Sequence, residues 1–184
     1  MTRLAPPKPE EMTEAQRAAA AEISAGPRGG VSGPFGLLLH SPELCNHVQR
    51  IGAFLRFNAT LPDDQREFAI IMVGRHYTCQ YEWVAHVRIA RDAKLPEHII
   101  QALAHRKRPD FKGDADLEAI YEFVNALLKG GTVEQGLYDR TMKRFGKEKV
   151  FELVGISGFY SIISMTLNTF DVEPKFKDEP LLPV

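Results

Sequence analysis

The stretch EFAIIMVGRHYTCQYEWVAH, from Glu67 to His86, decides the fold and holds the densest cluster of reactive side chains in the sequence. Within it, Cys79, Glu82 and His86 stand at positions i, i+3 and i+7, so on one helix they share a face. Glu67 lies twelve residues before Cys79, on the preceding helix. If these two helices pack as an antiparallel pair, Glu67 approaches His86 and orients its imidazole. We therefore expect a carboxylate–histidine pair suited to general acid or base catalysis near neutral pH.

Helix signals extend outward from this stretch in both directions, whereas the apolar–polar alternation typical of strands is missing from the sequence. Thr13 with Gln16 and Thr132 with Gln135 have the spacing of capping boxes, and Ser41 before a proline is typical of an N-cap. The predicted helices cover residues 13–26, 41–57, 61–77, 78–93, 95–106, 114–130, 132–146 and 147–170, with a Gly/Pro-rich loop over 26–34. The sequence therefore predicts an all-α protein built as a helical bundle.

Length and composition predict a single domain over 1–184. The chain has 184 residues, 23 Lys plus Arg against 24 Asp plus Glu, and two cysteines. That length is typical of one domain, and the balanced charge offers no basic surface for nucleic acid. Two distant cysteines exclude a disulfide scaffold. Because the prolines gather near the two termini, we expect residues 1–10 and 173–184 to form extended arms.

The last predicted helix is apolar enough to suggest a membrane span. Leu153 to Phe170 contains no charged residue, but it includes six Ser, Thr or Asn side chains. We therefore expect it in a core or a subunit interface and predict no membrane association. The N-terminus has no apolar signal segment, so we expect a cytoplasmic protein. On the helix over 41–57, a buried stripe is predicted at four residues with helical spacing, namely Leu44, Val48, Ile51 and Leu55.

The reactive residues also admit simpler explanations. Glu82 and His86, four residues apart, have the spacing of a surface pair, and Cys79 alone is typical of a small buried side chain. If Cys79 occupies the first turn of its helix, the helix dipole favours its thiolate. A metal site formed by His76, Glu82 and His86 is a weaker option, because the spacing matches no specific ligand motif. The residues alone leave these possibilities open.

The same region resembles the carboxymuconolactone decarboxylase family, which includes the alkylhydroperoxidase D-like proteins. The similarity lies in Leu61-Pro62 through Glu67, Val73-Gly74-Arg75, CQYEWVAH over 79–86, Ala90, Leu95-Pro96, IIQAL over 99–103, GPFGLLLHSP over 33–42, and 159–168. It covers most of the chain, from about Gly33 to Val172. The resemblance implies an all-helical fold of the alkylhydroperoxidase D-like type, whose subunits join into trimers or hexamers.

The peroxidase branch of this family carries the pattern Glu-x11-Cys-x2-Cys-x3-His, in which two cysteines cycle between dithiol and disulfide. Glu67, Cys79 and His86 match this pattern, but Glu82 stands in place of the second cysteine. The resemblance therefore implies that the redox cycle through a disulfide within the motif is not available. Cys45 can resolve Cys79 only if the fold brings their Cα atoms within about 7 Å.

The decarboxylase branch is more similar, because Tyr81-Glu82-Trp83 followed by His86 is like its pattern. The resemblance implies removal of CO2 from a small carboxylated lactone, with His86 as proton donor. Glu67 then orients His86, and Glu82 is a second acid or base or a substrate contact. Further substrate contacts are expected from the basic and aromatic side chains Arg75, His76, Tyr81 and Arg56. The resemblance implies no metal and no organic cofactor.

Three functions remain open for the chain. The first is a cofactor-free lyase that acts on a small carboxylated lactone or a related acid. The second is a thiol-dependent alkylhydroperoxidase or peroxiredoxin-like antioxidant protein that uses Cys79, with Cys45 or an external thiol as its partner. The third is a helical homo-oligomer that binds a small acid without turning it over.

Overall fold

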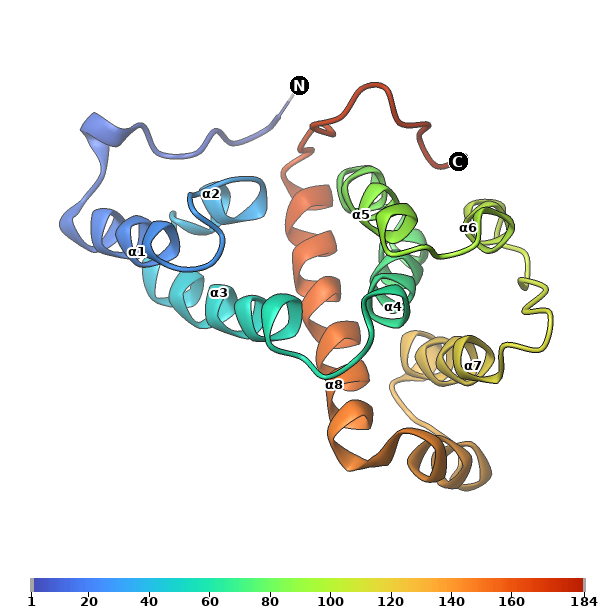
Figure 1. Cartoon of the computed structure of the whole chain (residues 1–184). Coiled ribbons are helices and arrows are strands. Elements are labelled where there is room, and N and C mark those ends of the chain that lie inside the picture. The colour runs from blue at the N-terminus through green and yellow to red at the C-terminus, as the bar shows by residue number, and fades with distance from the viewer. Residues whose placement is uncertain (1, 184) are drawn as a thin grey trace. The chain divides into compact units, whose positions relative to one another are not determined.

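The computed structural model describes residues 2–183, in which every regular element is helical (Figure 1). The elements are η1 (Pro9–Glu11), α1 (Glu14–Ala25), α2 (Pro34–Leu38), α3 (Pro42–Phe57), α4 (Asp63–His76), α5 (Gln80–Asp92), α6 (Glu97–Ala104), α7 (Ala115–Gly130) and α8 (Gln135–Thr169). The predicted all-α fold is confirmed. The chain groups into two compact units, the first running up to Ala59 and including Thr169–Val172, and the second comprising Thr60–Asn168 and the chain from Glu173 onward. The prediction of a single domain stays a prediction.

In the first unit, α3 packs against α1 and α2. The predicted capping box begins α1, since Thr13 Oγ1 accepts a hydrogen bond from the Gln16 amide and Gln16 Oε1 accepts one from the Thr13 amide. Both carboxylate oxygens of Glu22 on α1 accept hydrogen bonds from Arg50 on α3, at 2.7 and 3.0 Å. At the start of α3, however, the Ser41 side chain makes no capping hydrogen bond.

The predicted buried stripe on α3 is only half right. Val48 and Leu55 are buried, but Leu44 and Ile51 are each 50% exposed. The buried face is turned by part of a helical turn toward Cys45, because α1 and α2 cover that side of α3. The other side of α3 therefore presents apolar side chains to the outside of the chain, at Leu44, Ile51, Phe54 and Phe57.

The second unit is built around α4, which contacts α5, α6 and α7. Every residue from Glu67 to Arg75 is buried, so α4 is covered on all sides over these residues. Its start is held by Glu152 of α8, whose carboxylate accepts hydrogen bonds from the backbone amides of Thr60 at 2.8 Å and Leu61 at 3.0 Å. These bonds satisfy backbone donors that precede the first turn of the helix. Glu152 thereby fixes where α4 begins.

The two predicted C-terminal helices are confirmed as the two halves of α8, which is broken at Gly146. That residue has φ 74° and ψ 173°, a backbone conformation that favours glycine. The predicted capping box at Thr132 is wrong, because α8 begins at Gln135 and the Glu134 carboxylate accepts the hydrogen bond from the Leu137 amide instead. The helix α8 is long and apolar enough to cross a membrane, judged by length and composition alone. In its most apolar segment of 18 residues, 56% of the residues are buried inside the protein.

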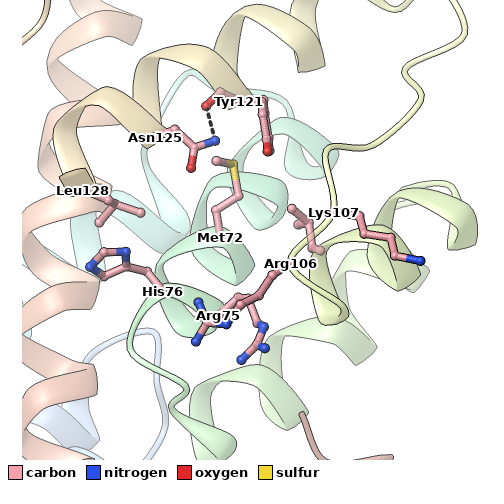
Figure 2. Close-up of a pocket in the computed structure, with 9 residues that line it drawn as sticks. Met72, Arg75, His76, Arg106, Lys107, Tyr121, Asn125 and Leu128 are labelled. Atoms are coloured by element: carbon pink, nitrogen blue, oxygen red, sulfur yellow. Dashed lines mark hydrogen bonds between the residues drawn. The ribbon is translucent and has the colours of Figure 1, made fainter. Parts of the chain in front are cut away.

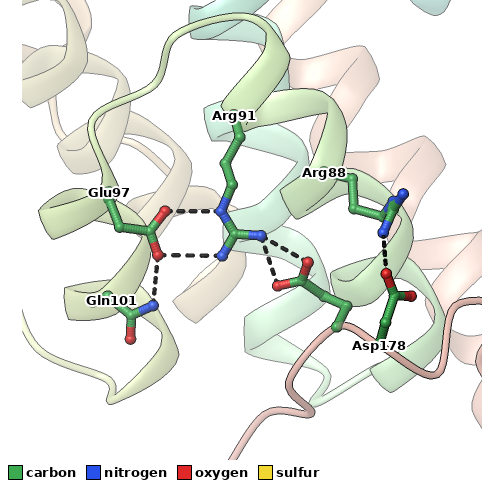
Figure 3. A network of polar contacts seen from close by, with 6 residues as sticks. Arg88, Arg91, Glu97, Gln101 and Asp178 are labelled. Carbon is green, nitrogen blue, oxygen red and sulfur yellow. Dashed lines mark hydrogen bonds and ion pairs between the residues drawn. The ribbon is translucent and has the colours of Figure 1, made fainter.

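The C-terminal arm is anchored to α5 (Figure 3). The Arg91 guanidinium lies between Glu97 at 2.8 Å and Glu179 of the arm at 2.7 Å. The backbone of Leu182 exchanges two hydrogen bonds with the Gln80 side chain. Leu182 itself is only 2% exposed, so the arm contributes an apolar side chain to the core of the second unit.

Candidate active site

Glu67 and His86 form a buried pair at the contact between α4 and α5. Glu67 Oε2 lies 2.7 Å from His86 Nδ1, and the two residues are 1% and 5% exposed. The approach that the spacing predicted is therefore confirmed. As a carboxylate, Glu67 accepts the proton of Nδ1–H, which fixes the ring orientation and leaves Nε2 as the nitrogen that faces the other way.

The second ring nitrogen of His86 faces Glu82. Nε2 lies 3.4 Å from Glu82 Oε2, which is within ion-pair distance but longer than a strong hydrogen bond. Glu82 is 4% exposed, so the interpretation of Glu82 and His86 as a surface pair is wrong. The helices α4 and α5 pack closely at this point. A β-carbon added to Gly74 of α4 would lie only 3.6 Å from the β-carbon of Glu82. The imidazole thus has a carboxylate on each side.

Two further side chains lie next to this pair. The Tyr160 ring of α8 packs edge-to-face on the His86 ring, with centroids 5.1 Å apart. The Arg66 guanidinium lies 3.8 Å from the second oxygen of Glu67 and forms an ion pair with Asp63 at 2.8 Å. Neither Tyr160 nor Arg66 was predicted from the sequence as a site residue. Tyr160 belongs to the segment that resembles the family, but no spacing relates a residue of α8 to His86.

Cys79 lies at the N-cap of α5 and is completely buried. The pKa of its thiol is raised to about 11, chiefly by burial and to a smaller extent by the charge of Glu82. The backbone amides of Glu82 and Tyr81 and the side chain of Ser164 lower the pKa by less than burial raises it. The expectation that the helix dipole favours the thiolate is therefore wrong, because loss of hydration outweighs the dipole at a fully buried sulfur.

The four expected substrate contacts lie in different places. Tyr81 follows Cys79 on α5, and burial, with a further contribution from Glu82, raises the pKa of its phenol. Arg75 and His76 line a pocket whose lining includes none of Glu67, Cys79, Glu82 and His86. Arg56 lies on α3 of the first unit, with its guanidinium 5.5 Å from the centroid of the Phe57 ring.

The remaining reactive groups do not join this cluster into a larger site. Cys45 is buried on α3 of the first unit, where burial, and then the charge of Glu22, raises the pKa of its thiol to about 11. Among residues 2–183, no three His, Cys, Asp or Glu side chains are grouped so that they hold a metal ion. What the cluster offers chemically is a buried imidazole that exchanges a proton at Nε2 while Glu67 holds Nδ1.

Comparison with known proteins relates the chain to solved structures only. No protein-family model and no curated protein matches it. An uncharacterized peroxidase-related protein from Ralstonia eutropha JMP134, described as an alkylhydroperoxidase AhpD core, superposes with a TM-score of 0.75 at 18% identity, over 95% of this chain and 92% of that one. An uncharacterized peroxidase-related protein from Silicibacter sp. TM1040 has a TM-score of 0.75 at 16% identity, over 99% and 96%. The chain therefore has the alkylhydroperoxidase D-like fold that its sequence resemblance implied.

Proposed function

We propose that this protein is an acid–base enzyme of the decarboxylase type, which acts without a cofactor on a small carboxylated lactone or a related acid. One observation carries the proposal, namely that the His86 imidazole is buried with a carboxylate at each ring nitrogen. Buried carboxylate–histidine groups of this kind are the usual means by which proteins move protons near neutral pH.

The reaction needs only a proton and an electron sink. The bond between the substrate carbon and its carboxylate breaks, CO2 leaves, and the electron pair stays in the conjugated lactone. His86, protonated from solvent, delivers its Nε2 proton to the carbon that has become electron-rich, while Glu67 holds the ring at Nδ1. Glu82, 3.4 Å from Nε2, is positioned to take part in returning a proton to the imidazole. The dry surroundings of these residues favour loss of charge from the substrate carboxylate.

The test is turnover of carboxymuconolactone, measured as CO2 release. We expect release by the wild-type protein and a fall of about 10²–10⁴-fold in the His86→Gln variant, the range typical of removing a general acid. Cys79→Ala is the matched control, because it changes a buried side chain in the same cluster without touching the imidazole. Release that is absent in the wild type across related lactones, or unchanged in His86→Gln, contradicts the proposal.

A thiol-dependent peroxidase is the second candidate, favoured by the contacts of Cys79 with Glu82 and by the peroxidase-related description of both similar structures. In this function the Cys79 thiolate attacks a hydroperoxide, the O–O bond breaks, and an alcohol and Cys79 sulfenic acid form. An external thiol then reduces the sulfenic acid. The raised pKa of Cys79 opposes this step, because only the thiolate is nucleophilic. Hydroperoxide consumption that is lost in Cys79→Ser would favour it over the lyase.

We also propose that the chain assembles with copies of itself. The support is the apolar side of α3, where Leu44, Ile51, Phe54 and Phe57 are each 44–50% exposed within one chain. A contiguous apolar surface of this kind is typical of a protein–protein contact. Light scattering is expected to give a trimer or hexamer, and Ile51→Asp is expected to reduce the mass toward that of one chain. A wild-type protein that is monomeric at all concentrations contradicts this proposal.

A further inference from the structure

A polar pocket lies at the end of α4 away from Glu67 (Figure 2). It has a volume of about 130 Å³ and lies among α4, the end of α6 and α7. Its polar lining consists of Arg75, His76, Arg106, Lys107, Tyr121 and Asn125, and no Asp or Glu belongs to the lining. The pocket therefore collects positive charge without a carboxylate of its own.

Arg75 and Arg106 are held together through Thr78. The Thr78 hydroxyl oxygen accepts hydrogen bonds from Arg75 Nη1 at 3.2 Å and from Arg106 Nη2 at 2.8 Å. Two guanidinium groups thus share one small acceptor, and Figure 2 draws them next to each other. The pKa of Arg75 is lowered first by burial and then by the charge of Arg106. Such an arrangement is unfavourable unless an anion completes it.

No described residue supplies that anion. Arg75 is 7% exposed, yet its hydrogen bonds in residues 2–183 go only to Thr78 and to the Pro183 carbonyl, and its Nε has no acceptor there. Thr78 and Arg106 both adopt left-handed backbone conformations, with φ 48° and 55°. Residues without a glycine's freedom adopt this region at a cost, and such residues concentrate where a ligand is bound.

We propose that this pocket binds a small oxyanion, through a phosphate or a carboxylate group that Arg75 and Arg106 hold together. The planar guanidinium fork suits either group, because both present two or more acceptor oxygens in one plane or on one face. The volume admits a group several times larger than a water molecule. Figure 2 shows the amino end of Lys107 directed away from the two guanidinium groups, so Lys107 adds charge at the rim without direct contact.

This site goes beyond the proposed lyase function and does not rest on it. Arg75 lies eight residues after Glu67 on α4, which separates their Cα atoms by about 12 Å along the helix axis. None of Glu67, Cys79, Glu82 and His86 lines the pocket. Binding is therefore measured directly, without reference to turnover.

Titration calorimetry with inorganic phosphate and, separately, with acetate tests the site, at an ionic strength kept constant with chloride. We expect saturable binding by the wild-type protein, a loss of affinity of about tenfold or more in Arg106→Gln, and a change of less than about twofold in Lys107→Gln. Arg106 and Lys107 are both exposed, so neither variant disturbs the core. Lys107→Gln removes the same charge from the neighbouring position and is the matched control.

A second readout is the His76 imidazole, whose pKa is lowered by burial and then by the charge of Arg106. NMR titration of Arg106→Gln is expected to show a higher pKa for His76 than in the wild-type protein. The pKa of His76 is also expected to rise when the wild-type protein is saturated with phosphate. Binding of phosphate alone identifies a phosphate-group site, and binding of acetate with similar affinity identifies a carboxylate site. If neither anion saturates, or if Arg106→Gln and Lys107→Gln bind equally well, the proposal is overturned.

Discussion

The buried charged groups at the two ends of α4 have different kinds of partner. Near its start, Glu67 is buried against His86 of the same chain, 2.7 Å away, and Glu82 faces the other side of the ring. At its end, Arg75 is buried beside Arg106, and among the described residues these two share the Thr78 hydroxyl as acceptor, while Arg75 also donates to the Pro183 carbonyl. The first cluster contains its own opposite charge, and the second does not.

This difference separates the group proposed to transfer protons from the group proposed to hold an anion. A buried histidine between two carboxylates is complete without a ligand, and its proton can move between partners that are already in place. A buried guanidinium beside a second, exposed one and without a carboxylate is incomplete, since the cost of desolvating the buried charge is offset only when an anion arrives. The same helix thus positions the proposed proton-transfer cluster at one end and the proposed anion pocket at the other.

Breaking the self-contained cluster should have the largest effect. Glu67→Gln removes the carboxylate that fixes the His86 ring, and we expect kcat for CO2 release to fall by about 10²-fold or more, with KM nearly unchanged. The nitrogen chemical shifts of His86 are expected to show a changed tautomer in the same variant. Glu67→Asp is the control, because it keeps a carboxylate near the ring and should recover part of kcat. Equal activity of wild type and Glu67→Gln would remove Glu67 from the positioning role.

The buried surroundings and the charge of Glu82 should also control the pKa of the Cys79 thiol. With a pKa of about 11 against 9.0 for an unperturbed cysteine, the native thiol has about one hundredth of the thiolate of the unfolded one below pH 9. Alkylation by iodoacetamide in a Cys45→Ala background should be slower by that factor in the folded protein. Glu82→Gln should accelerate alkylation, because the Glu82 charge raises this pKa.

The sign of the accompanying change in stability follows from the same shift. Below pH 9 the thiol is protonated in both states, so Cys79 contributes no pH dependence there. Between pH 9 and about 11 only the unfolded thiol ionises, and the free energy of unfolding should therefore fall as the pH rises. Cys79→Ala should show a shallower decrease in this window. Identical slopes for the two proteins, or alkylation of native Cys79 at the unfolded rate, would show that burial does not govern this thiol.

Adding a carboxylate to the pocket lined by Arg75 and Arg106 should have the smallest of these effects. It tests directly whether the two ends of α4 differ because only one contains its own opposite charge. Asn125 lies in the α7 wall of the pocket, and Asn125→Asp places a negative charge there with almost no change of shape. We expect the affinity for inorganic phosphate to fall by about tenfold, since the pocket then contains its own anion. Asn125→Ala is the control and should retain phosphate affinity. Tighter phosphate binding in Asn125→Asp would mean that the guanidinium groups do not face the ligand.

Much of the fold and the central pair of the site were predictable from the sequence. Capping residues, prolines at helix starts and the spacing of apolar side chains are local signals, and they placed α4, α5 and both halves of α8 within a few residues. The juxtaposition of Glu67 and His86 followed from two adjacent helices joined by a short turn, which leaves antiparallel packing as the simple arrangement. The predicted cap at Thr132 was wrong because Glu134, which is closer to the helix, accepts the hydrogen bond from the Leu137 amide.

The rest of the site depends on segments that are far apart in the chain. Tyr160 reaches His86 from α8, Glu152 of α8 holds the start of α4, and Glu179 reaches Arg91 from the C-terminal arm. No periodicity connects such residues, so neither their contacts nor the pocket between α4 and α7 was expected. The exposed side of α3 has the same origin, because spacing shows that Leu44 and Ile51 share a face but not that α1 and α2 leave it uncovered.

The sequence by itself determined an all-helical chain, a cysteine followed three residues later by Glu82, and a carboxylate in reach of His86. Those features depend on residue type and on spacing along one or two helices. The tertiary structure decided that burial raises the pKa of the Cys79 thiol, that Glu82 is buried beside His86, and that Arg75 and Arg106 share Thr78 as an acceptor. Desolvation and the nearest charges set these properties, and both depend on what distant parts of the chain bring around a group.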